Sequence, residues 1–438
     1  MGRNSWYSGQ SSQDQSAPSS MAPAAVAGAI APAHNGVADS NVAPSIPKYN
    51  QIVPQSVPVN ACWNGNSSVQ VDVIVDRSIG KALNYFVEFD VTYTNSANTA
   101  GVAYLASAAS LIDHYDILYN GSVIETVYAN NLFYEGMVLK TDQELAQHAP
   151  IWGIDFNSST GYPQPSKVDI SGAVTTAQQT YYVPLVGVVP SAQLFIAGVK
   201  GEIRYRFYLA AKPLCGANGF VSTSTVSINL KNMTLWCEEA SLSDETFNAL
   251  LRQHKQGINY RSVLRTLWQK TQPTLTAGNT QTDILNAFSN DSAGLLVYLT
   301  SNSLDNGYFM SRIPLKNLQL LDAGGATLTR VLGSSLVENS ITTSVTPVAS
   351  SFVNNPSFNT YIFPFCSSIE RVLNCGSQPK GGLKLSAQEQ LSINVDSNQT
   401  SVLENVISWD YCAMRVQKGE LKWARTAGDL PGWAAADY

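Results

Sequence analysis

The sequence predicts an all-β protein made of two similar β-sandwiches in tandem, and three observations lead to this prediction. The stretch 111–128 holds two short apolar-rich runs joined by Asn120-Gly121, which is the strongest local signal for a tight hairpin. A weaker copy of this pattern follows at 315–331, where Gly324-Gly325 replaces the Asn-Gly turn. Charged residues make up only 13% of the chain and hydrophobic residues 44%, which suits strands and turns more than surface helices.

Two further landmarks recur in the same order in the two halves of the chain. The sequence YYVPLVGV at 181–188 parallels YIFPFCSS at 361–368, and each has a proline at its fourth position. The sequence LWC at 235–237 corresponds in the same way to DYC at 410–412. Together with the two hairpins, these matches favour an internal duplication over chance.

Composition divides the chain into four segments. Residues 1–60 are low in complexity, rich first in Ser and Gln and then in Ala and Pro, so we expect them to form a flexible N-terminal arm. We assign 61–255 to the first module and 256–416 to the second, and 417–438 form a polar C-terminal tail. The boundary element is a helix, because 241–244 (SLSD) offers a helix N-cap with an acidic N3 residue and a glycine follows at 257.

Alternation of apolar and polar residues predicts the strands of the first module, most clearly at 84–94 and 201–210. The stretch 129–148 is instead predicted to be a helical insertion, with Pro150 beyond its end. The remaining strands expected in the two modules are 67–77, 180–189, 225–237, 295–300, 318–321, 359–366, 389–395 and 402–416.

Charge and cysteine content exclude several classes of partner and cofactor. The formal net charge is −6 and no basic tail or stripe occurs, so strong direct binding to nucleic acid is not expected. The six cysteines lie far apart without a metal-ligand spacing, and we interpret them as mostly buried thiols rather than disulfides. The sequence contains no run of eighteen apolar residues, so we expect no transmembrane helix.

The polar side chains that could carry chemistry do not form a convincing site. His114 and Asp116 would share a strand face, but no nucleophile motif accompanies them, and a structural polar pair is favoured. Arg204 and Arg206 share a face and could bind an acidic partner, although a subunit-contact or solvated face is favoured. Glu238 and Glu239 are neighbours on one expected strand, so their side chains point to opposite faces and cannot act together as a carboxylate pair. We therefore expect no catalytic, cofactor-binding or metal-binding residues, no cofactor and no enzyme activity.

The chain resembles the double jelly-roll major capsid proteins of the adenovirus–tectivirus lineage in three passages. These are YDILYNGSVIETVY at 115–128, YYVPLVGVVPSAQLFIAGVKGEIRYRF at 181–207 and INLKNMTLWCEEASLSDETFNALL at 228–251. The likeness extends over 61–416, but the proline passage of the second half reads PF rather than PL and lacks the same strand after it.

The resemblance implies two tandem eight-stranded jelly rolls with short helical insertions and a flexible N-terminal arm. It further implies a major capsid protein of an icosahedral virus or phage, made in the host cytoplasm and located in the virion shell. Three copies would form a pseudo-hexameric capsomer that contacts neighbouring capsomers, with minor capsid proteins and an internal membrane as further candidate partners.

The alternative from another class is a carbohydrate-binding or adhesion β-sandwich. Its expected features are an aromatic platform beside two carboxylates on the same face. The 20 tyrosines of the chain leave this alternative open.

Overall fold

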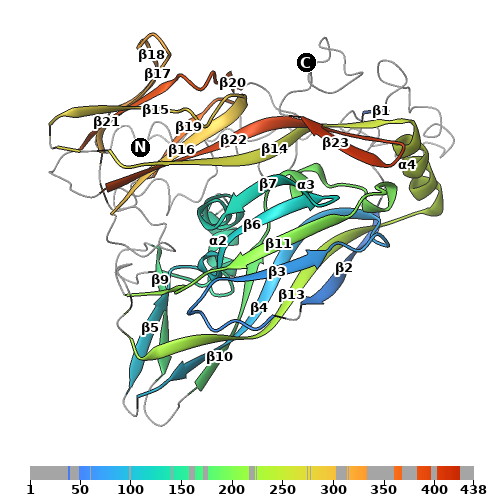
Figure 1. Cartoon of the computed structure of the whole chain (residues 1–438), viewed down its shortest axis with the longest axis horizontal. Helices are drawn as coiled ribbons and strands as arrows, with labels where there is room; N and C mark the ends of the chain where they lie inside the picture. Colours follow the sequence, from blue (N-terminus) through green and yellow to red (C-terminus); the bar gives the residue numbers. More distant parts are fainter. Residues whose placement is uncertain are drawn as a thin grey trace, which may run out of the picture.

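The fold is given by a computed structural model, whose described part has three long gaps after residue 301. The described residues are 38–39, 49–59, 61–97, 100–138, 140, 142–156, 163–170, 176–216, 222, 224–273, 275–276, 278–301, 313, 315–332, 360–366, 382–395 and 402–424. Within these residues the strands form five sheets, of which four build two sandwiches that lie one against the other (Figure 1).

The first sandwich contains eight strands in the described part of the chain. They are β2 (Tyr49–Val59), β3 (Val69–Ile74), β4 (Lys81–Asn95), β6 (Ile112–Tyr119), β7 (Ser122–Tyr128), β10 (Thr176–Pro184), β11 (Ile203–Leu209) and β13 (Val226–Leu242). Numbered one to eight along the chain, these strands are ordered 1-8-3-6 in one sheet and 2-7-4-5 in the other. This alternation between two packed sheets is the jelly-roll connection.

The second sandwich repeats this connection among the described residues. Its strands are β14 (Ile258–Thr271), β15 (Thr280–Ile284), β16 (Asp291–Ser301), β17 (Leu315–Leu321), β18 (Thr327–Leu332), β19 (Thr360–Pro364), β21 (Gln390–Val395) and β22 (Val402–Gln417). They too are ordered 1-8-3-6 and 2-7-4-5. The fold is therefore a tandem of two eight-stranded jelly rolls, as the sequence predicts.

Shorter elements extend the two rolls. The strands are β1 (Ala38–Asp39), β5 (Gly101–Leu105), β8 (Ile154–Phe156), β9 (Pro163–Ile170), β12 (Leu214–Cys215), β20 (Leu383–Lys384) and β23 (Glu420–Ala424). The helices are η2 (Ala108–Leu111), α1 (Ala129–Asn131), η3 (Leu132–Val138), α2 (Asp142–His148), α3 (Val188–Ala192), η4 (Ile196–Gly198) and α4 (Asp244–Gln256). The run from α1 to α2 confirms the predicted helical insertion.

The two predicted hairpins are the fourth and fifth strands of the two rolls, which confirms that they are equivalent. In the first roll, Asn120 and Gly121 have φ values of 50° and 81°, and this pair of left-handed residues makes the type I′ turn that suits strand twist. In the second roll, β17 and β18 are joined by the longer loop 322–326, where only Gly325 has a positive φ, of 84°.

The proline passages are also equivalent, because Pro184 ends the sixth strand of the first roll and Pro364 ends that of the second. The LWC and DYC passages lie on the eighth strand of each roll, but the residue correspondence predicted between them is wrong by two positions. Trp236 pairs with Phe86, whereas the residue paired in the same way with Gly294 is Trp409.

The boundaries of the arm, the tail and the helix differ from the prediction. Strand β2 lies inside the expected arm and pairs along its length with β13, so the first roll begins before residue 61. Strand β23 lies inside the expected tail and pairs with β22 of the same chain. Helix α4 is capped by Ser243, whose hydroxyl accepts from the Thr246 N–H at 3.3 Å, so it begins two residues later than expected.

The two rolls bury their strands differently, and this explains the weaker sequence pattern of the second half. Strand β4 alternates regularly between buried and half-exposed residues. Strand β16 is buried along both faces, because one face fills the core of the second roll and the other packs on the first roll. A strand with two buried faces reads as a continuous apolar run rather than an alternation. The neighbouring strand β14 was missed by the sequence analysis because its residues, INYRSVLRTLWQKT, neither alternate nor form an apolar run, and its register shifts between Tyr260 and Val263.

A glycine pair tests the turn geometry of the first hairpin. We expect Gly121→Ala to lower the free energy of unfolding by about 1–2 kcal/mol, because its φ of 81° is strained for a residue with a Cβ. Its added Cβ would meet nothing within 4 Å, so the backbone alone sets this cost. The matched control is Gly324→Ala in the second hairpin, where we expect a change within about 0.5 kcal/mol. Equal effects of the two substitutions in urea denaturation would contradict this account.

Candidate functional site: the junction between the rolls and an exposed aromatic face

The first candidate site is the junction at which the first roll covers the 1-8-3-6 sheet of the second (Figure 1). The covering elements are β7 and the helices α1, η3 and α3. Asn130 of α1 donates its side-chain N–H to the Tyr298 hydroxyl at 3.1 Å, and Ser191 of α3 accepts the Leu264 N–H at 2.9 Å. The Tyr134 and Tyr298 rings pack at 4.8 Å between centroids. The junction is thus a packed interior with specific polar contacts.

Glu125 of β7 connects the two rolls through both of its carboxylate oxygens. One oxygen accepts the Val188 N–H of the first roll at 2.7 Å, and the other accepts the Thr266 N–H of the second roll at 2.9 Å. Burial raises the pKa of this carboxyl to about 8, although the two backbone N–H groups and the nearby charge of Arg265 act to lower it. Glu125 is therefore a buried acid that holds a proton near neutral pH.

Glu135 of η3 reaches the same point of the second roll, where it accepts a short hydrogen bond from the Thr266 hydroxyl. Burial raises its pKa to about 7, and this hydrogen bond and the charge of Lys140 oppose the rise. Two buried carboxyls from the first roll thus converge on one threonine of the second. Each requires its hydrogen bonds, because an unpaired buried acid costs several kcal/mol.

A second seam joins the rolls near the end of the described chain. The Leu421 N–H donates to the Tyr119 hydroxyl at 3.1 Å, and the Lys200 N–H donates to the Gly419 carbonyl at 2.8 Å. His254 of α4 lies 2.9 Å from the Tyr260 hydroxyl, and burial lowers the pKa of its imidazole to about 4. The imidazole is neutral at neutral pH, so this histidine is a structural contact.

The structure does not bring His114 and Asp116 together. The His114 ring stacks on Tyr208 at 4.2 Å between centroids, and its Nδ1 lies 2.6 Å from an oxygen of Asp113. The Asp116 carboxylate accepts instead from the Thr126 hydroxyl at 2.6 Å. The expected polar pair is therefore wrong in its partner. His34 lies outside the described residues.

The arginines share a face, as expected, but their acidic partner belongs to the same chain. Arg204 and Arg206 both bind the Asp72 carboxylate, at 2.9 and 3.0 Å. Hydrogen bonding from Arg206 is the main cause that holds the pKa of Asp72 below its usual value. The neighbours Glu238 and Glu239 accept from different groups, the Asn84 side chain and the Gly80 N–H.

The cysteines of the described part agree in part with the interpretation as buried thiols. Cys215, Cys237 and Cys412 are buried, whereas Cys62 is exposed and Cys366 is partly exposed. Burial raises the pKa of Cys237 to about 12, so it is an inert thiol at neutral pH. Cys375 lies outside the described residues.

The second candidate site is the outward face of the 1-8-3-6 sheet of the first roll, which we call the aromatic face. It is formed by Phe86, Tyr182 and Trp236 together with Glu88 and Asp90, and all five side chains are partly exposed. The Phe86 ring lies 5.7 Å from Tyr182 and 6.1 Å from Trp236, with which it is nearly parallel. The Trp236 N–H donates to Glu88 at 2.6 Å.

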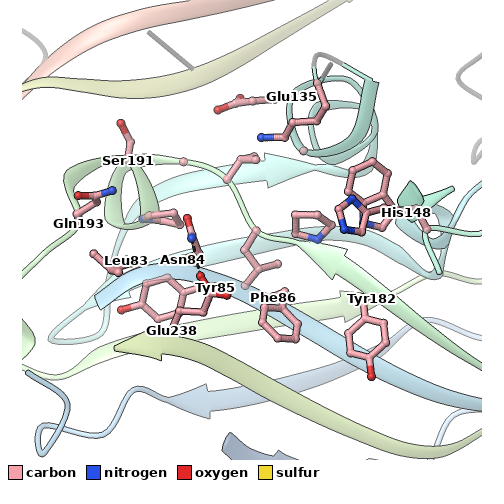
Figure 2. Close-up of a pocket in the computed structure, with 18 of the residues that line it drawn as sticks. Leu83, Asn84, Tyr85, Phe86, Glu135, His148, Tyr182, Ser191, Gln193 and Glu238 are labelled. Atoms are coloured by element: carbon pink, nitrogen blue, oxygen red, sulfur yellow. Dashed lines mark hydrogen bonds between the residues drawn. The ribbon is translucent and has the colours of Figure 1, made fainter. Parts of the chain in front are cut away.

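A pocket of about 490 Å³ adjoins the aromatic face, between β4 and the helices of the junction (Figure 2). Phe86 and Tyr182 line one side, and Glu135 and His148 line another. The sequence analysis missed this site, although Phe86 and Trp236 fall on the outward positions of their strands. Aromatic residues at positions that are otherwise polar were the available signal.

The described residues show no group of three or more His, Cys, Asp or Glu side chains that could hold a metal ion. None of the helices in the described ranges has the length and hydropathy to cross a membrane.

The junction carboxyls make a testable prediction about pH. Their folded pKa values, about 8 and about 7, lie above the ordinary 4.5, so the folded chain binds more protons than the unfolded chain up to about pH 8. Stability therefore falls as pH rises through this range, by up to about 1.4 kcal/mol per pH unit for each group. His254, with its lowered pKa, acts in the opposite direction only below its ordinary value of 6.5, and Lys81, whose pKa burial lowers to about 8, does so mainly above pH 8. Glu404 lies outside the junction, and burial raises its pKa to about 9, so it adds a slope of the same sign over pH 6.5–8. The share of Glu125 is therefore the difference in slope between the parent chain and a variant at this position.

Urea denaturation across pH 6.5–8 measures this slope. We expect Glu125→Gln to reduce the slope, because the amide does not titrate, and to lower stability at the acidic end because it keeps only one acceptor oxygen. Glu238→Gln, outside the junction, serves as the matched control and should keep the parent slope. A parent protein whose stability rises with pH across the window would contradict the assigned protonation.

Comparison with known structures identifies the fold. No protein-family model matches the sequence, and no curated protein does. The PBCV-1 virus capsid structure is similar at a TM-score of 0.62 and 14% identity, covering 86% of this chain and 97% of the other. The Faustovirus major capsid protein follows at 0.58 and 10%, covering 86% and 92%. The Sulfolobus turreted icosahedral virus structure is similar at 0.51 and 11%, covering 82% and 90%. This chain therefore has the double jelly-roll fold of these viral capsid structures.

Proposed function

We propose that this chain is the major structural subunit of an icosahedral virus or phage shell. The observation that carries the proposal is the repetition of one strand order, 1-8-3-6 and 2-7-4-5, in two rolls packed against each other. A unit with two similar modules can approximate sixfold shape with only three copies, since each copy supplies two of the six positions. The similar folds named above come from virus capsids, which supports the same role here.

We further propose that the assembled unit is a homotrimeric, pseudo-hexameric capsomer that tiles the shell beside neighbouring capsomers. The intrachain junction supports this, because it fixes the relative position of the rolls through buried contacts at Thr266 and Tyr298. A rigid pair of rolls is what a regular shell requires of its subunit. We take 61–255 and 256–416 as the domains, with β2 and β23 added to them, and the residues before β2 as the arm that contacts minor capsid proteins or an internal membrane.

We also propose that the chain has no catalytic activity, uses no cofactor and does not bind nucleic acid strongly and directly. The polar side chains that the sequence singled out bind one another within the chain, as Arg204 and Arg206 do with Asp72. The net charge of −6 supports protein rather than nucleic-acid partners. We place the protein in the virion shell, after synthesis in the host cytoplasm.

A second candidate function is favoured by one specific observation. The aromatic face carries the rings of Phe86, Tyr182 and Trp236 beside Glu88 and Asp90, which is the arrangement expected of a carbohydrate-binding or adhesion sandwich. Two of its polar groups are already used within the face, since Glu88 binds Trp236 and Asp90 accepts from the Thr180 hydroxyl at 2.6 Å. The capsid role therefore stands as the principal proposal.

Size-exclusion chromatography with light scattering separates the two functions. For the capsid role we expect a mass three times the 47.2 kDa of the single chain, with six-sided particles in negative stain. A monomer that a polysaccharide column retains would overturn the capsid role in favour of the carbohydrate-binding one. Chromatography at two salt concentrations controls for weak charge-driven association, which should fall as salt rises.

A further inference from the structure

Two buried carboxyl groups face each other inside the second roll. Glu404 of β22 pairs with Thr271 of β14 on one side and with Leu299 of β16 on the other. Directly paired residues share a face of a sheet, and Leu299 belongs to the core of the second roll, so the Glu404 side chain points inward. Asp283 of β15 pairs with the core residue Leu391 and points inward from the opposite sheet. The two carboxyl groups lie in hydrogen-bonding contact across the roll.

These carboxyl groups lack the donors that buried acceptors require. Glu404 is fully buried, and neither of its carboxylate oxygens accepts a hydrogen bond within the described part of the chain. The Oδ2 atom of Asp283 is likewise buried without a donor, while its Oδ1 atom accepts the Gln281 side-chain N–H at 3.5 Å. Two ionised carboxylates in contact repel each other, and burial strengthens this repulsion. The pair therefore requires a proton or a cation between its oxygens.

A hydroxyl group beside the pair favours the cation. The Thr271 hydroxyl is buried without a hydrogen-bond partner, and the strand register places it on the same inward face as Glu404. One shared proton would satisfy one oxygen of Glu404 and one of Asp283, but it would leave the second Glu404 oxygen and this hydroxyl unpaired. A cation can bind all four oxygens together, because carboxylates and hydroxyls are hard oxygen ligands.

The side chains around the pair in the described chain do not supply the missing positive charge. The residues that pair with the two acids along the strands are uncharged. Lys270 is next to Thr271 in the sequence, but it lies on the other face of β14, where its Nζ is 5.7 Å from the centroid of the Trp268 ring. The neighbouring charge that acts on Glu404 is the negative charge of Asp283. A bound cation would supply the charge that these surroundings lack.

We propose that Glu404, Asp283 and Thr271 form a calcium site that joins the two sheets of the second roll (Figure 1). Two carboxylates match the charge of a divalent cation, and Ca²⁺ takes about 6–8 oxygen ligands in a flexible geometry. Mg²⁺ fits less well in a buried site, because it demands octahedral geometry and gives up its water reluctantly. In the cation-free chain the pair retains a proton, which Ca²⁺ displaces on binding. This inference goes beyond the proposed function, and neither depends on the other.

Bound calcium would connect an edge strand to the sheet opposite. Among the described strands, β15 is the outer strand of its sheet and pairs only with β21. Gln269 of β14 already joins the two sheets beside the site, since its side chain donates to the Ile284 carbonyl at 2.8 Å and accepts the Ala287 N–H at 3.0 Å. A cation adds a charged link at the same edge, so we expect it to stabilise the second roll and to slow local opening of β15.

Equilibrium dialysis with radioactive Ca²⁺ tests the site on the full chain, after a chelator has removed divalent cations. We expect one tightly held Ca²⁺ per chain, which Mg²⁺ at the same concentration displaces poorly. Asp283→Asn and Thr271→Val should each weaken binding at least about tenfold, because the charge and number of ligands set calcium affinity. The matched control is Asp169→Asn in the first roll, an exposed carboxylate paired with Lys167, which should keep the parent affinity.

Hydrogen exchange supplies a second measurement that locates the bound ion. Ca²⁺ should slow exchange of the backbone amides of β15, Thr280–Ile284, and leave those of β6, Ile112–Tyr119, unchanged. Glu404→Gln removes one of the two negative charges while keeping the shape of the side chain, so it should abolish the protection of β15. Circular dichroism of this variant without Ca²⁺ controls for folding.

The outcomes separate the calcium site from a shared proton and from surface binding. A parent chain that binds no Ca²⁺ and keeps the same exchange at β15 would overturn the site in favour of a shared proton. Binding that keeps the parent affinity in both Asp283→Asn and Glu404→Gln would overturn it in favour of an adventitious ion at the surface. The trimer mass measured by light scattering decides the capsid role separately in either case.

Discussion

The structure depends on one sheet that is buried on both of its faces. Strands β14, β22, β16 and β19 close the core of the second roll with one face and pack on the first roll with the other. The buried Glu125 and Glu135 anchor this second contact at Thr266, where their hydrogen bonds offset the cost of burying acidic groups. Loss of that contact would expose Leu296, Ile407 and Trp409 to water, so each roll stabilises the other.

The duplication gives the same strand order two different environments. In the second roll the outward positions of the 1-8-3-6 sheet are Leu296, Ile362 and Ile407, and they are inside the molecule. In the first roll the corresponding sheet keeps Glu88, Asp90 and Thr180 at its surface, with Phe86, Tyr182 and Trp236 among them. One ancestral surface thus has an intrachain form that is apolar and an exposed form that is aromatic and acidic.

The residues that looked chemically active in the sequence have hydrogen-bond, ion-pair or stacking partners within the same chain. Arg204 and Arg206 share Asp72, His114 stacks on Tyr208, and Glu238 and Glu239 bind separate groups. The acidic groups that connect the two rolls are instead Glu125 and Glu135, whose pKa values burial raises. The sequence analysis did not single out either residue. Their significance comes from burial between two rolls that are far apart in sequence, and no local pattern reports such burial.

By itself, the sequence determined the β class, the two hairpins at Asn120-Gly121 and Gly324-Gly325, and the alternating strands of the first roll such as β4. These features are local, because turn chemistry and the period of two act over a few residues. Only the tertiary structure decided that β14 is a strand and that the predicted strand β16 is buried on both faces. It also decided that β2 belongs to the first roll, and that Trp409 rather than Tyr411 is the counterpart of Trp236. The physical reason is that register and burial between strands depend on partners more than a hundred residues away, as in the pairing of β16 with β22.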